Sequence, residues 1–317
     1  MALLTPLTDS DAARVADSYA LGRVLRVEPL AAGSVNSNFV LTTERGRFFL
    51  RIYEEQRSDG VAFEWRLLDH LSALGIAVPR RIVGPAPGEL TVASKPTGLF
   101  ELVGGFERCR RQVEAHHLAQ VGEALARVHL ASEGFALSGR DRFDAASLQA
   151  RLDEVSLDAH PELASDVARI RATLDSISVR ALPMGIVHGD LFRDNVRWEG
   201  DRLAALLDWE SASYGVLAFD VMVVCLAWCW TDRLEWPLAR AFARAYHSAR
   251  PLTGEERRSL GEVARFACAR FATTRVTDFY LRGGPGSSGY RDYKRFLARL
   301  DLVESMAEGE LAARLVD

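Results

Sequence analysis

One short polar segment and an aspartate that follows it are the strongest candidates for chemistry in this sequence of 317 residues. The segment contains His188, Asp190 and Asn195 in the spacing H-x-D-L-x-x-x-N, and Asp208 follows thirteen residues after Asn195. A carboxylate such as that of Asp190 can accept the proton of a hydroxyl group. The Asp208 carboxylate and the Asn195 amide oxygen are hard ligands of the kind that magnesium prefers. Together these groups have the chemistry that phosphoryl transfer from a nucleotide to an alcohol requires.

The residues between the two candidate metal ligands predict how these groups come together. Val196 to Trp198 has the pattern of a short strand, Glu199 to Asp201 that of a turn, and Arg202 to Asp208 that of a returning strand. A β-hairpin of this length returns Asp208 to the loop that holds Asp190. We therefore expect the candidate base and both metal ligands to converge at one edge.

Each of these residues also has a structural alternative when it is taken alone. An isolated aspartate is often a turn residue, but the ordered combination is much less expected by chance and favours a kinase-like site. The catalytic loop of protein kinases has the same spacing, with arginine where this sequence has Gly189 and D-F-G where it has Asp208-Trp209-Glu210. His188 is expected to hydrogen-bond within the loop rather than to catalyse. Asp220 is expected to cap a helix that begins at Val221.

Two features of the first hundred residues are candidates for contacts with nucleotide phosphates. One is a loop between two predicted strands, whose small or polar residues can cover phosphates: Gly33, Ser34, Asn36 and Asn38. The other is Arg51 in the third predicted strand, where kinases place a phosphate-binding lysine, with Glu64 in the next helix as its partner. The alternatives are an ordinary hairpin loop and a solvent-facing arginine. Only two of the 39 basic residues are lysines, Lys95 and Lys294, and neither is expected at that position.

The hydrophobic pattern predicts a small β-rich lobe, a hinge and a larger helical lobe. Strands are predicted at 24–30, 39–43, 48–53, 90–93 and 99–103, with one helix at 61–74. Beyond Gly104-Gly105 the pattern is helical, at 112–130, 145–157 and 162–177. A β-rich insert from Gly185 to Trp209 follows, after which the chain is predicted to be helical almost to its end. We predict a nucleotide-binding lobe at residues 1–103 and a helical lobe with the catalytic loop and substrate site at 104–317.

Composition excludes several other classes of protein. The net charge of -4 and a charged fraction of 26% argue against a nucleic-acid-binding surface and against disorder. The N-terminus lacks the pattern of a signal peptide, and the longest apolar stretch, Val221 to Trp230, is about half of a membrane span. We therefore expect a cytoplasmic protein without membrane or nucleic-acid partners. Cys225 and Cys229 are expected to be buried free thiols.

The segment from His188 to Asn195, together with Leu206-Leu207-Asp208-Trp209, resembles the aminoglycoside phosphotransferase and choline kinase superfamily. Within it the sequence is most similar to the bacterial homoserine-kinase branch. Softer matches lie at Gly33 to Phe39, Gly122 to Ala131, Leu226 to Cys229 and Ala264 to Leu281. The resemblance therefore covers most of the chain, from about residue 25 to residue 300.

The resemblance implies an α+β, bilobal, protein-kinase-like fold that uses ATP and Mg²⁺, with adenine near Glu101 and Val103. It implies that Asp190 is the catalytic base and that Asn195 and Asp208 are the metal ligands. The acceptor would be a small alcohol, L-homoserine, and the product O-phospho-L-homoserine, an intermediate of threonine synthesis. The superfamily often has lysine where this chain has an arginine in the third strand. Homoserine-kinase-like members also tend to lack that lysine, so the phosphate contacts stay open.

The acceptor is the least determined part of this interpretation. An amino-acid acceptor needs a cation for its carboxylate and an acceptor for its amine, and the candidates are Arg193, Asp194 and Glu210, with Arg275 and Asp278. The alternative acceptors are an aminoglycoside, choline or another amino alcohol. An aminoglycoside is a polycation, and the stretch after Asp208 is not strongly acidic, which favours a smaller acceptor. A non-catalytic nucleotide-binding protein is the remote alternative, and the oligomeric state is open.

Overall fold

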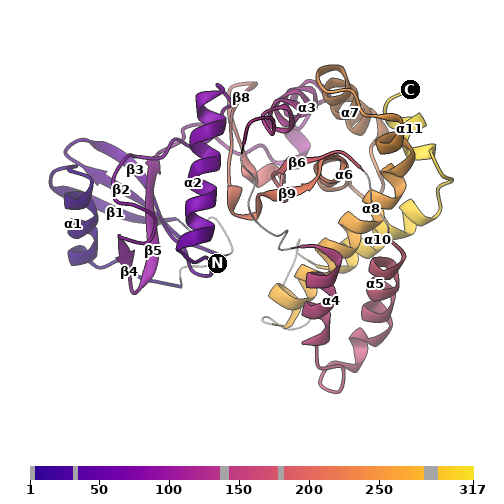
Figure 1. Cartoon of the computed structure of the whole chain (residues 1–317), viewed down its shortest axis with the longest axis horizontal. Helices are drawn as coiled ribbons and strands as arrows, with labels where there is room; N and C mark the ends of the chain where they lie inside the picture. Colours follow the sequence, from indigo (N-terminus) through magenta and orange to yellow (C-terminus); the bar gives the residue numbers. More distant parts are fainter. Residues whose placement is uncertain (1–3, 31–34, 136–142, 178–181, 282–291) are drawn as a thin grey trace. The chain divides into compact units, whose positions relative to one another are not determined.

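Five strands near the N-terminus form one antiparallel sheet in the computed structural model of the chain (Figure 1). Their order across the sheet is β1-β2-β3-β5-β4. The strands are β1 (Val24–Leu30), β2 (Ser37–Thr43), β3 (Gly46–Ile52), β4 (Thr91–Val92) and β5 (Lys95–Glu101). All the strands predicted for this part of the chain are present, and their ends differ from the predicted ones by a few residues.

The structure describes residues 4–30, 35–135, 143–177, 182–281 and 292–317. The chain divides into two compact units. The first unit comprises residues 1–108 and 194–210, and the second unit comprises residues 109–193 and 211–317. The predicted lobe boundary between residues 103 and 104 stays a prediction.

Helix α1 (Asp9–Ser18) covers one face of the sheet in the first unit. Leu50 and Ile52 of β3 point to this face, where they share a buried apolar cluster with Val15 of α1. The sequence pattern predicted one helix in this part of the chain, and α1 is an addition to it. Its start nevertheless carries a signal, because the Thr8 hydroxyl accepts a backbone N–H of the first turn at 3.1 Å.

Helix α2 (Ser58–Ala73) covers the opposite face of the same sheet (Figure 1). Arg51 and Tyr53 alternate with the apolar residues of β3 and therefore point to this face. The indole N–H of Trp65 on α2 donates to the Tyr53 hydroxyl at 3.1 Å. Packing of α2 on the sheet thus places a cationic side chain in a buried environment.

The predicted hairpin is confirmed and belongs to the first unit. It consists of β7 (Val196–Glu199) and β8 (Arg202–Leu206), with Val196 opposite Leu206. Trp198 anchors the hairpin because its backbone exchanges two hydrogen bonds of 3.0 Å with Phe106, and its side chain is fully buried. The strands therefore hold both ends of the hairpin in a fixed register.

The second unit is mostly helical, as predicted. Its helices of six residues or more are α3 (Ala115–Leu130), α4 (Ala145–Asp153), α5 (Ala164–Ser176), α6 (Leu217–Trp228), α7 (Trp236–Ala249), α8 (Gly254–Arg275), α10 (Lys294–Glu304) and α11 (Glu310–Leu315). A π-helical turn, Val276–Tyr280, follows α8. Helices α3 and α7 approach closely at Gly122, where a Cβ atom would lie 2.5 Å from the Phe242 carbonyl oxygen. The predicted combination of a small antiparallel sheet and a larger helical part is confirmed.

Two elements around the segment that holds the predicted base differ from the prediction. Strand β6 (Met184–Val187) pairs with β9 (Ser213–Val216), which the sequence pattern missed. Helix α6 begins at Leu217, so the prediction that Asp220 caps a helix starting at Val221 is wrong. The apolar residues before Asp220 extend the helix by one turn, and Asp220 is fully buried within it.

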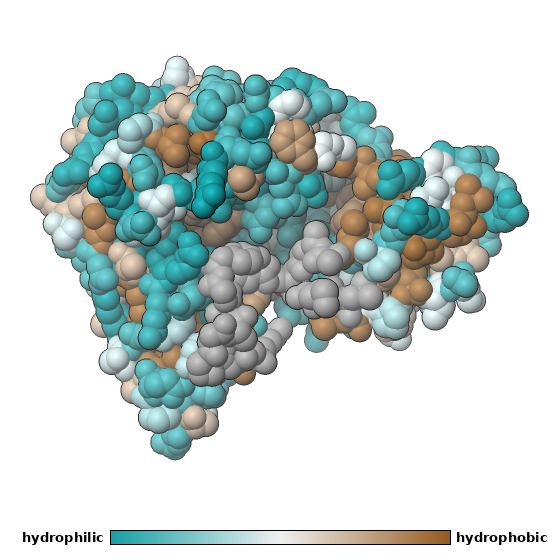
Figure 2. All heavy atoms as spheres, turned by 180° about the vertical axis from the view of Figure 1, so that it is seen from behind, coloured by the Kyte–Doolittle hydropathy of each residue, from teal (hydrophilic) through white to brown (hydrophobic). Residues whose placement is uncertain are grey.

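The apolar stretch at 221–230 is part of the buried core of the second unit. Helix α6 is buried on nearly all sides, and Cys225 and Cys229 are buried free thiols, as predicted. In the described part of the chain, no helix combines the length and the apolar character that crossing a bilayer requires. Hydrophilic side chains cover much of the face shown in Figure 2, with apolar atoms in scattered patches between them.

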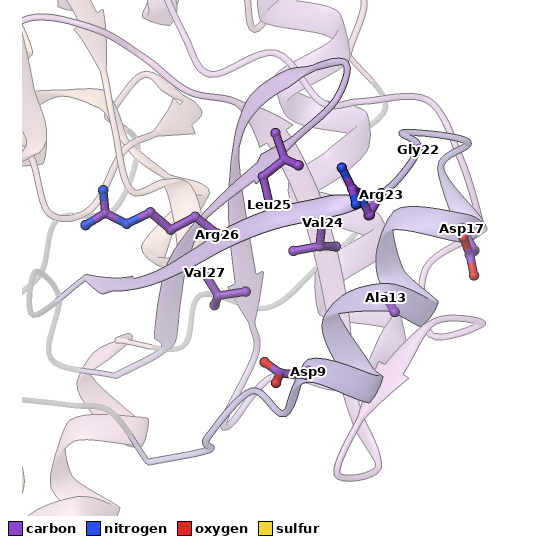
Figure 3. A pocket seen from close by; sticks show the side chains of 9 residues that line it. All are labelled: Asp9, Ala13, Asp17, Gly22, Arg23, Val24, Leu25, Arg26 and Val27. Atoms are coloured by element: carbon purple, nitrogen blue, oxygen red, sulfur yellow. The ribbon is translucent and has the colours of Figure 1, made fainter.

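A groove of 510 Å³ lies in the first unit, between α1 and the start of β1 (Figure 3). Its walls consist of residues from α1, from the chain leading into β1 and from the first half of β1: Asp9, Ala13, Asp17, Gly22, Arg23, Val24, Leu25, Arg26 and Val27. None of these residues was predicted to act in nucleotide binding, metal binding or catalysis. The candidate site therefore has to be built from other side chains.

Candidate functional site

The two predicted metal ligands lie next to each other on the hairpin of the first unit. The backbone N–H of Leu207 donates to the Asn195 carbonyl oxygen at 2.8 Å, so Asp208 directly follows a residue paired with Asn195. The backbone of Asp208 has a φ of +60°, in the left-handed region. Such a conformation costs on the order of 1–3 kcal/mol for a residue other than glycine, and strained residues of this kind cluster at functional sites.

Arg51 is buried beneath α2 and faces two carboxylates. Its Nη1 lies 3.0 Å from Asp208 Oδ1 and 3.7 Å from Glu64 Oε1. Its Nε donates to the Asn38 side-chain oxygen at 3.3 Å. Because the residue is only 8% exposed, the solvent-facing alternative is wrong, and the predicted pairing with Glu64 is present.

Burial and charge oppose each other in this cluster. Burial alone would lower the pKa of Arg51, but the carboxylates of Asp208 and Glu64 outweigh it and hold the Arg51 pKa above its ordinary value. Burial raises the pKa of Glu64 to about 7, although the Arg51 charge acts in the opposite direction. Arg51 therefore remains charged, while Glu64 titrates near neutral pH.

Two carboxylate oxygens in this cluster are left without hydrogen bonds. Glu64 Oε2 and Asp208 Oδ1 are buried atoms that have no hydrogen-bond partner among the described residues, although Asp208 Oδ1 is ion-paired with Arg51. An unsatisfied buried oxygen is costly, so it needs a specific explanation. Hard, anionic oxygen next to an amide residue suits a divalent cation, so Asp208 and Asn195 fit the magnesium site that the sequence predicts.

The loop before β2 connects to the same cluster within the first unit. The Asn36 side-chain oxygen accepts the backbone N–H of Glu54 at 3.1 Å, and its amide group donates to the Glu210 carboxylate. Gln56 donates to the Glu210 backbone oxygen at 3.0 Å. The structure thus joins Asn36, predicted for the nucleotide, with Glu210, predicted for the acceptor. Gly33 and Ser34 lie outside the described residues.

The predicted adenine-contacting residues lie where β5 ends. Glu101 is the last residue of β5 and is exposed, and its backbone N–H donates to the Arg80 carbonyl oxygen at 2.8 Å. Val103 follows two residues later and is partly buried. Both belong to the first unit, Glu101 at the end of the strand that pairs with β3 and Val103 just beyond it.

The predicted base belongs to the second unit, in the loop after β6. Asp190 has a partly exposed side chain, and its backbone N–H donates to His188 Nδ1 at 3.3 Å. His188 is fully buried, which agrees with the structural role expected for it. Gly189 between them has a φ of +78°, and a Cβ atom there would lie 2.6 Å from the Ser211 carbonyl oxygen. This close contact explains why glycine stands where protein kinases carry arginine.

Asp220 fixes this loop from inside the second unit. Its carboxylate accepts the backbone N–H groups of His188 at 2.6 Å and Gly189 at 2.9 Å. His129 Nε2 lies 3.3 Å from the same carboxylate, and His129 Nδ1 lies 2.6 Å from the Tyr246 hydroxyl. Burial alone would raise the pKa of Asp220, but its hydrogen bonds and the nearby histidines lower that pKa below the ordinary value. The carboxylate is therefore held ionised as an acceptor for the loop.

The predicted acceptor-binding residues belong to both units: Asp194 and Glu210 to the first, and Arg193, Arg275 and Asp278 to the second. Arg193 and Asp194 occupy the short 3₁₀ turn after the predicted base. Arg275 donates to the Asp292 carbonyl oxygen at 3.1 Å, and Asp278 accepts two hydrogen bonds of 3.2 Å from Arg151. The last two residues are therefore engaged by neighbours within the second unit.

Sequence reasoning missed one cation beside the predicted base. Arg270 of α8 places Nη1 3.7 Å from Asp190 Oδ1, within the second unit. No spacing rule could identify it, because the two residues are eighty positions apart and α8 contains several other arginines. The contact depends on how α8 packs against the catalytic loop.

Comparisons with known proteins give a consistent result. Residues 26–260 match the family described as the phosphotransferase enzyme family. The chain is 34% identical over 298 residues to a homoserine kinase of Afipia carboxidovorans, covering 90% of this chain and 89% of that one. It is 31% identical over 322 residues to a homoserine kinase of Methylocella silvestris, covering 97% and 98%.

Similarity to a solved structure bears on the fold alone. The amicoumacin kinase hAmiN, in complex with AMP-PNP, Ca²⁺ and Ami, gives a TM-score of 0.72 at 13% identity. The likeness covers 94% of this chain and 96% of that one. The predicted kinase-like fold is therefore confirmed.

Proposed function

Because the chain belongs to the phosphotransferase enzyme family, we propose that it uses ATP and Mg²⁺ to phosphorylate the hydroxyl group of L-homoserine. The product is O-phospho-L-homoserine, an intermediate on the way to threonine. The homoserine kinases to which the chain is similar support this acceptor, since the similarity extends over nine-tenths or more of the chain. The first unit supports the use of a nucleotide and a metal.

The observation that carries the proposal is the cluster of Arg51, Glu64 and Asp208. A buried guanidinium held by Glu64 and directed at Asp208 has the chemistry to bind phosphate oxygens. Arginine provides this charge in a chain whose two lysines lie elsewhere, with Lys95 paired to Glu54. Asp208 Oδ1 is ion-paired with Arg51 but accepts no hydrogen bond, so a divalent cation can complete its coordination. We assign Arg51, Glu64, Asn36 and Asn38 to the phosphate side of the nucleotide site, together with Gly33 and Ser34, and Glu101 and Val103 to the adenine side.

The proposed roles in catalysis follow from the chemistry of each group. Asp190 orients the acceptor hydroxyl and takes its proton as the oxygen attacks the γ-phosphate. Asn195 and Asp208 hold Mg²⁺, which when bound neutralises the charge on the phosphates. Asp220 keeps the loop of Asp190 in place through two backbone N–H groups. Arg193, Asp194 and Glu210 stay candidates for contacts with the acceptor.

A panel of acceptors tests this proposal. Purified protein is incubated with ATP, MgCl₂ and homoserine, 3-aminopropan-1-ol, choline or kanamycin, and the products are identified by ³¹P NMR. We expect homoserine to give the highest kcat/KM and a phosphate monoester as product. Efficient phosphorylation of choline or kanamycin, with homoserine unchanged, would overturn the choice of acceptor. Hydrolysis of ATP without transfer to any alcohol would overturn the proposed activity itself.

A further inference from the structure

Arg270 of α8 lies beside Asp190, the proposed base, and is not among the residues assigned above to the nucleotide, the metal or the acceptor. Its Nη1 is 3.7 Å from Asp190 Oδ1. The Arg270 side chain is 5% exposed, whereas that of Asp190 is 36% exposed. A buried cation therefore stands next to a carboxylate that a small solute can reach. Charge interactions are strong at such a place because little water screens them.

Two aromatic rings orient the Arg270 guanidinium. Its Cζ lies 3.8 Å from the centre of the Phe271 ring and 4.1 Å from that of Phe143. Rings that stack on a guanidinium cover its flat faces and leave the N–H donors along its edge. This edge is the part that pairs with a planar carboxylate through two parallel hydrogen bonds. The rings therefore prepare Arg270 for recognition of a carboxylate.

A second buried arginine of the same unit has a purely structural role and serves as a comparison. Arg299 is also buried, with Trp230 at 4.9 Å and Phe296 at 4.8 Å from its Cζ. Its donors, however, bond to backbone carbonyl groups, including that of Leu226 at 2.7 Å. Burial and the charge of Arg275 lower the Arg299 pKa to about 9. Arg299 thus stabilises the packing of helices, whereas Arg270 faces the carboxylate of Asp190, the proposed base.

We propose that Arg270 binds the carboxylate of the acceptor and thereby selects a hydroxy amino acid over an amino alcohol. The inference rests on the proposed function, because it assumes that the acceptor hydroxyl bonds to Asp190. A short carbon chain joins the hydroxyl and the carboxylate of homoserine. With the hydroxyl held by Asp190, the carboxylate falls within reach of the neighbouring guanidinium. A site built for a charged group discriminates strongly against an analogue that lacks it.

Matched acceptors and matched variants test this inference. 3-Aminopropan-1-ol differs from homoserine only in lacking the carboxylate, and 4-hydroxybutanoate only in lacking the amine. The kcat and KM values for all three are measured with wild type, Arg270→Gln, Arg270→Lys and the control Arg299→Gln. The fraction of folded protein is determined by circular dichroism for each variant, and rates refer to folded protein.

We expect wild type to favour homoserine over 3-aminopropan-1-ol by about 100-fold or more. Arg270→Gln is expected to reduce this ratio to within about tenfold, mainly through a higher KM for homoserine and 4-hydroxybutanoate. Arg270→Lys keeps the positive charge without the planar guanidinium, so it should retain part of the ratio. This variant replaces Arg270→Gln in the test if the glutamine variant does not fold. Arg299→Gln is expected to lower stability and leave the ratio unchanged.

Two results would count against the inference, and they are distinguishable. An equal loss of kcat for all three acceptors in Arg270→Gln, with the ratio unchanged, would mean that Arg270 acts only on Asp190. Wild type that prefers 3-aminopropan-1-ol to homoserine would contradict the proposed function, and the inference would fall with it.

Discussion

The first and second units each contain a buried acidic cluster, and the two clusters differ in how completely their atoms are hydrogen-bonded. In the first unit, Arg51 faces Asp208 and Glu64, and one oxygen of each carboxylate has no hydrogen-bond partner within the described ranges. In the second unit, both oxygens of Asp220 accept backbone N–H groups, and His129 adds a further contact. Asp208 thus depends on an ion pair with Arg51, whereas both carboxylate oxygens of Asp220 accept hydrogen bonds.

This difference agrees with the proposal that the Arg51 cluster binds a ligand and that Asp220 has a structural role. An unsatisfied buried oxygen destabilises the folded chain, and Asp208 adds a strained left-handed backbone. Such costs are expected where a ligand completes the coordination. Asp220 has no such deficit, so its contribution is to hold the catalytic loop. Substitution of Asp208 should therefore reduce activity more than stability, and substitution of Asp220 should reduce stability more than activity.

Asp208→Asn should have the largest effect on activity and a smaller effect on folding than Asp220→Asn. Asparagine tolerates the left-handed backbone, but it removes the negative charge proposed to hold the metal. We expect kcat to fall by about 100-fold or more, while the free energy of unfolding falls by less than the about 2–4 kcal/mol expected for Asp220→Asn, because Glu64 remains paired with Arg51. Steady-state kinetics and urea denaturation measure the two quantities. A variant with near wild-type kcat would remove Asp208 from the site.

Asp220→Asn should show the reverse pattern. The amide replaces one acceptor oxygen with a donor, which leaves a loop N–H or His129 without its partner. We expect the free energy of unfolding to fall by about 2–4 kcal/mol, measured by urea denaturation. Activity per folded molecule should fall less than in Asp208→Asn. If Asp220→Asn unfolds at the same urea concentration as wild type, the scaffold role is wrong.

Glu64→Gln should change how stability depends on pH. The pKa of Glu64 in the folded protein is about 7, above its ordinary value of 4.5. Between these values the folded state keeps the proton and the unfolded chain loses it, so Glu64 lowers stability as the pH rises through this window. From pH 5 to pH 8, wild type should therefore lose about 1–3 kcal/mol more of its free energy of unfolding than Glu64→Gln does.

Glu54→Gln provides the control for that experiment. The Glu54 pKa is below its ordinary value, since Lys95, Ser37 and Thr5 outweigh the effect of burial. Its contribution is lost only as the pH falls below about 4.5. The stability difference between Glu54→Gln and wild type should thus be constant from pH 5 to pH 8. Parallel pH profiles for Glu64→Gln and Glu54→Gln would contradict the assignment.

Tyr246→Phe should have the smallest effect. The Tyr246 hydroxyl lies 2.6 Å from His129 Nδ1 and accepts a hydrogen bond of 3.0 Å from Arg250. Its removal should cost about 1–2 kcal/mol of stability and change kcat by less than about threefold. Thermal unfolding and kinetics of Tyr246→Phe can be compared with Tyr293→Phe, which removes one hydroxyl contact, to Asp166. A large drop in kcat for Tyr246→Phe alone would make Tyr246 part of the catalytic machinery rather than a support.

The comparison of the clusters also shows what sequence patterns reveal. The hairpin from Val196 to Leu206 was predictable because strand and turn signals are local and their lengths fix the register. The alternation along β3 predicts that Arg51 and Leu50 point to opposite faces of the sheet. It does not predict whether the face of Arg51 is exposed to solvent or covered by α2. Burial of Arg51 therefore required the tertiary packing.

Residues that act through distant contacts were not predictable. Asp220 lies in a long apolar run, where the start of a helix has no clear signal, so its position was assigned one turn too late. Strand β9 pairs with β6 across an intervening hairpin, and Arg270 meets Asp190 from a helix eighty residues away. These contacts depend on packing, which no local pattern encodes.

The central claim is that this chain transfers the γ-phosphate of ATP to the hydroxyl of homoserine with Asp190 as the base. The most direct test is to follow transfer of label from γ-³²P-ATP to homoserine by wild type and by Asp190→Asn, with ATP binding measured on both by calorimetry. We predict labelled O-phosphohomoserine with wild type, a rate about 10²–10⁴ times lower with Asp190→Asn, and similar ATP affinities. An Asp190→Asn variant that transfers label at the wild-type rate, or wild type that leaves homoserine unlabelled, would contradict the claim.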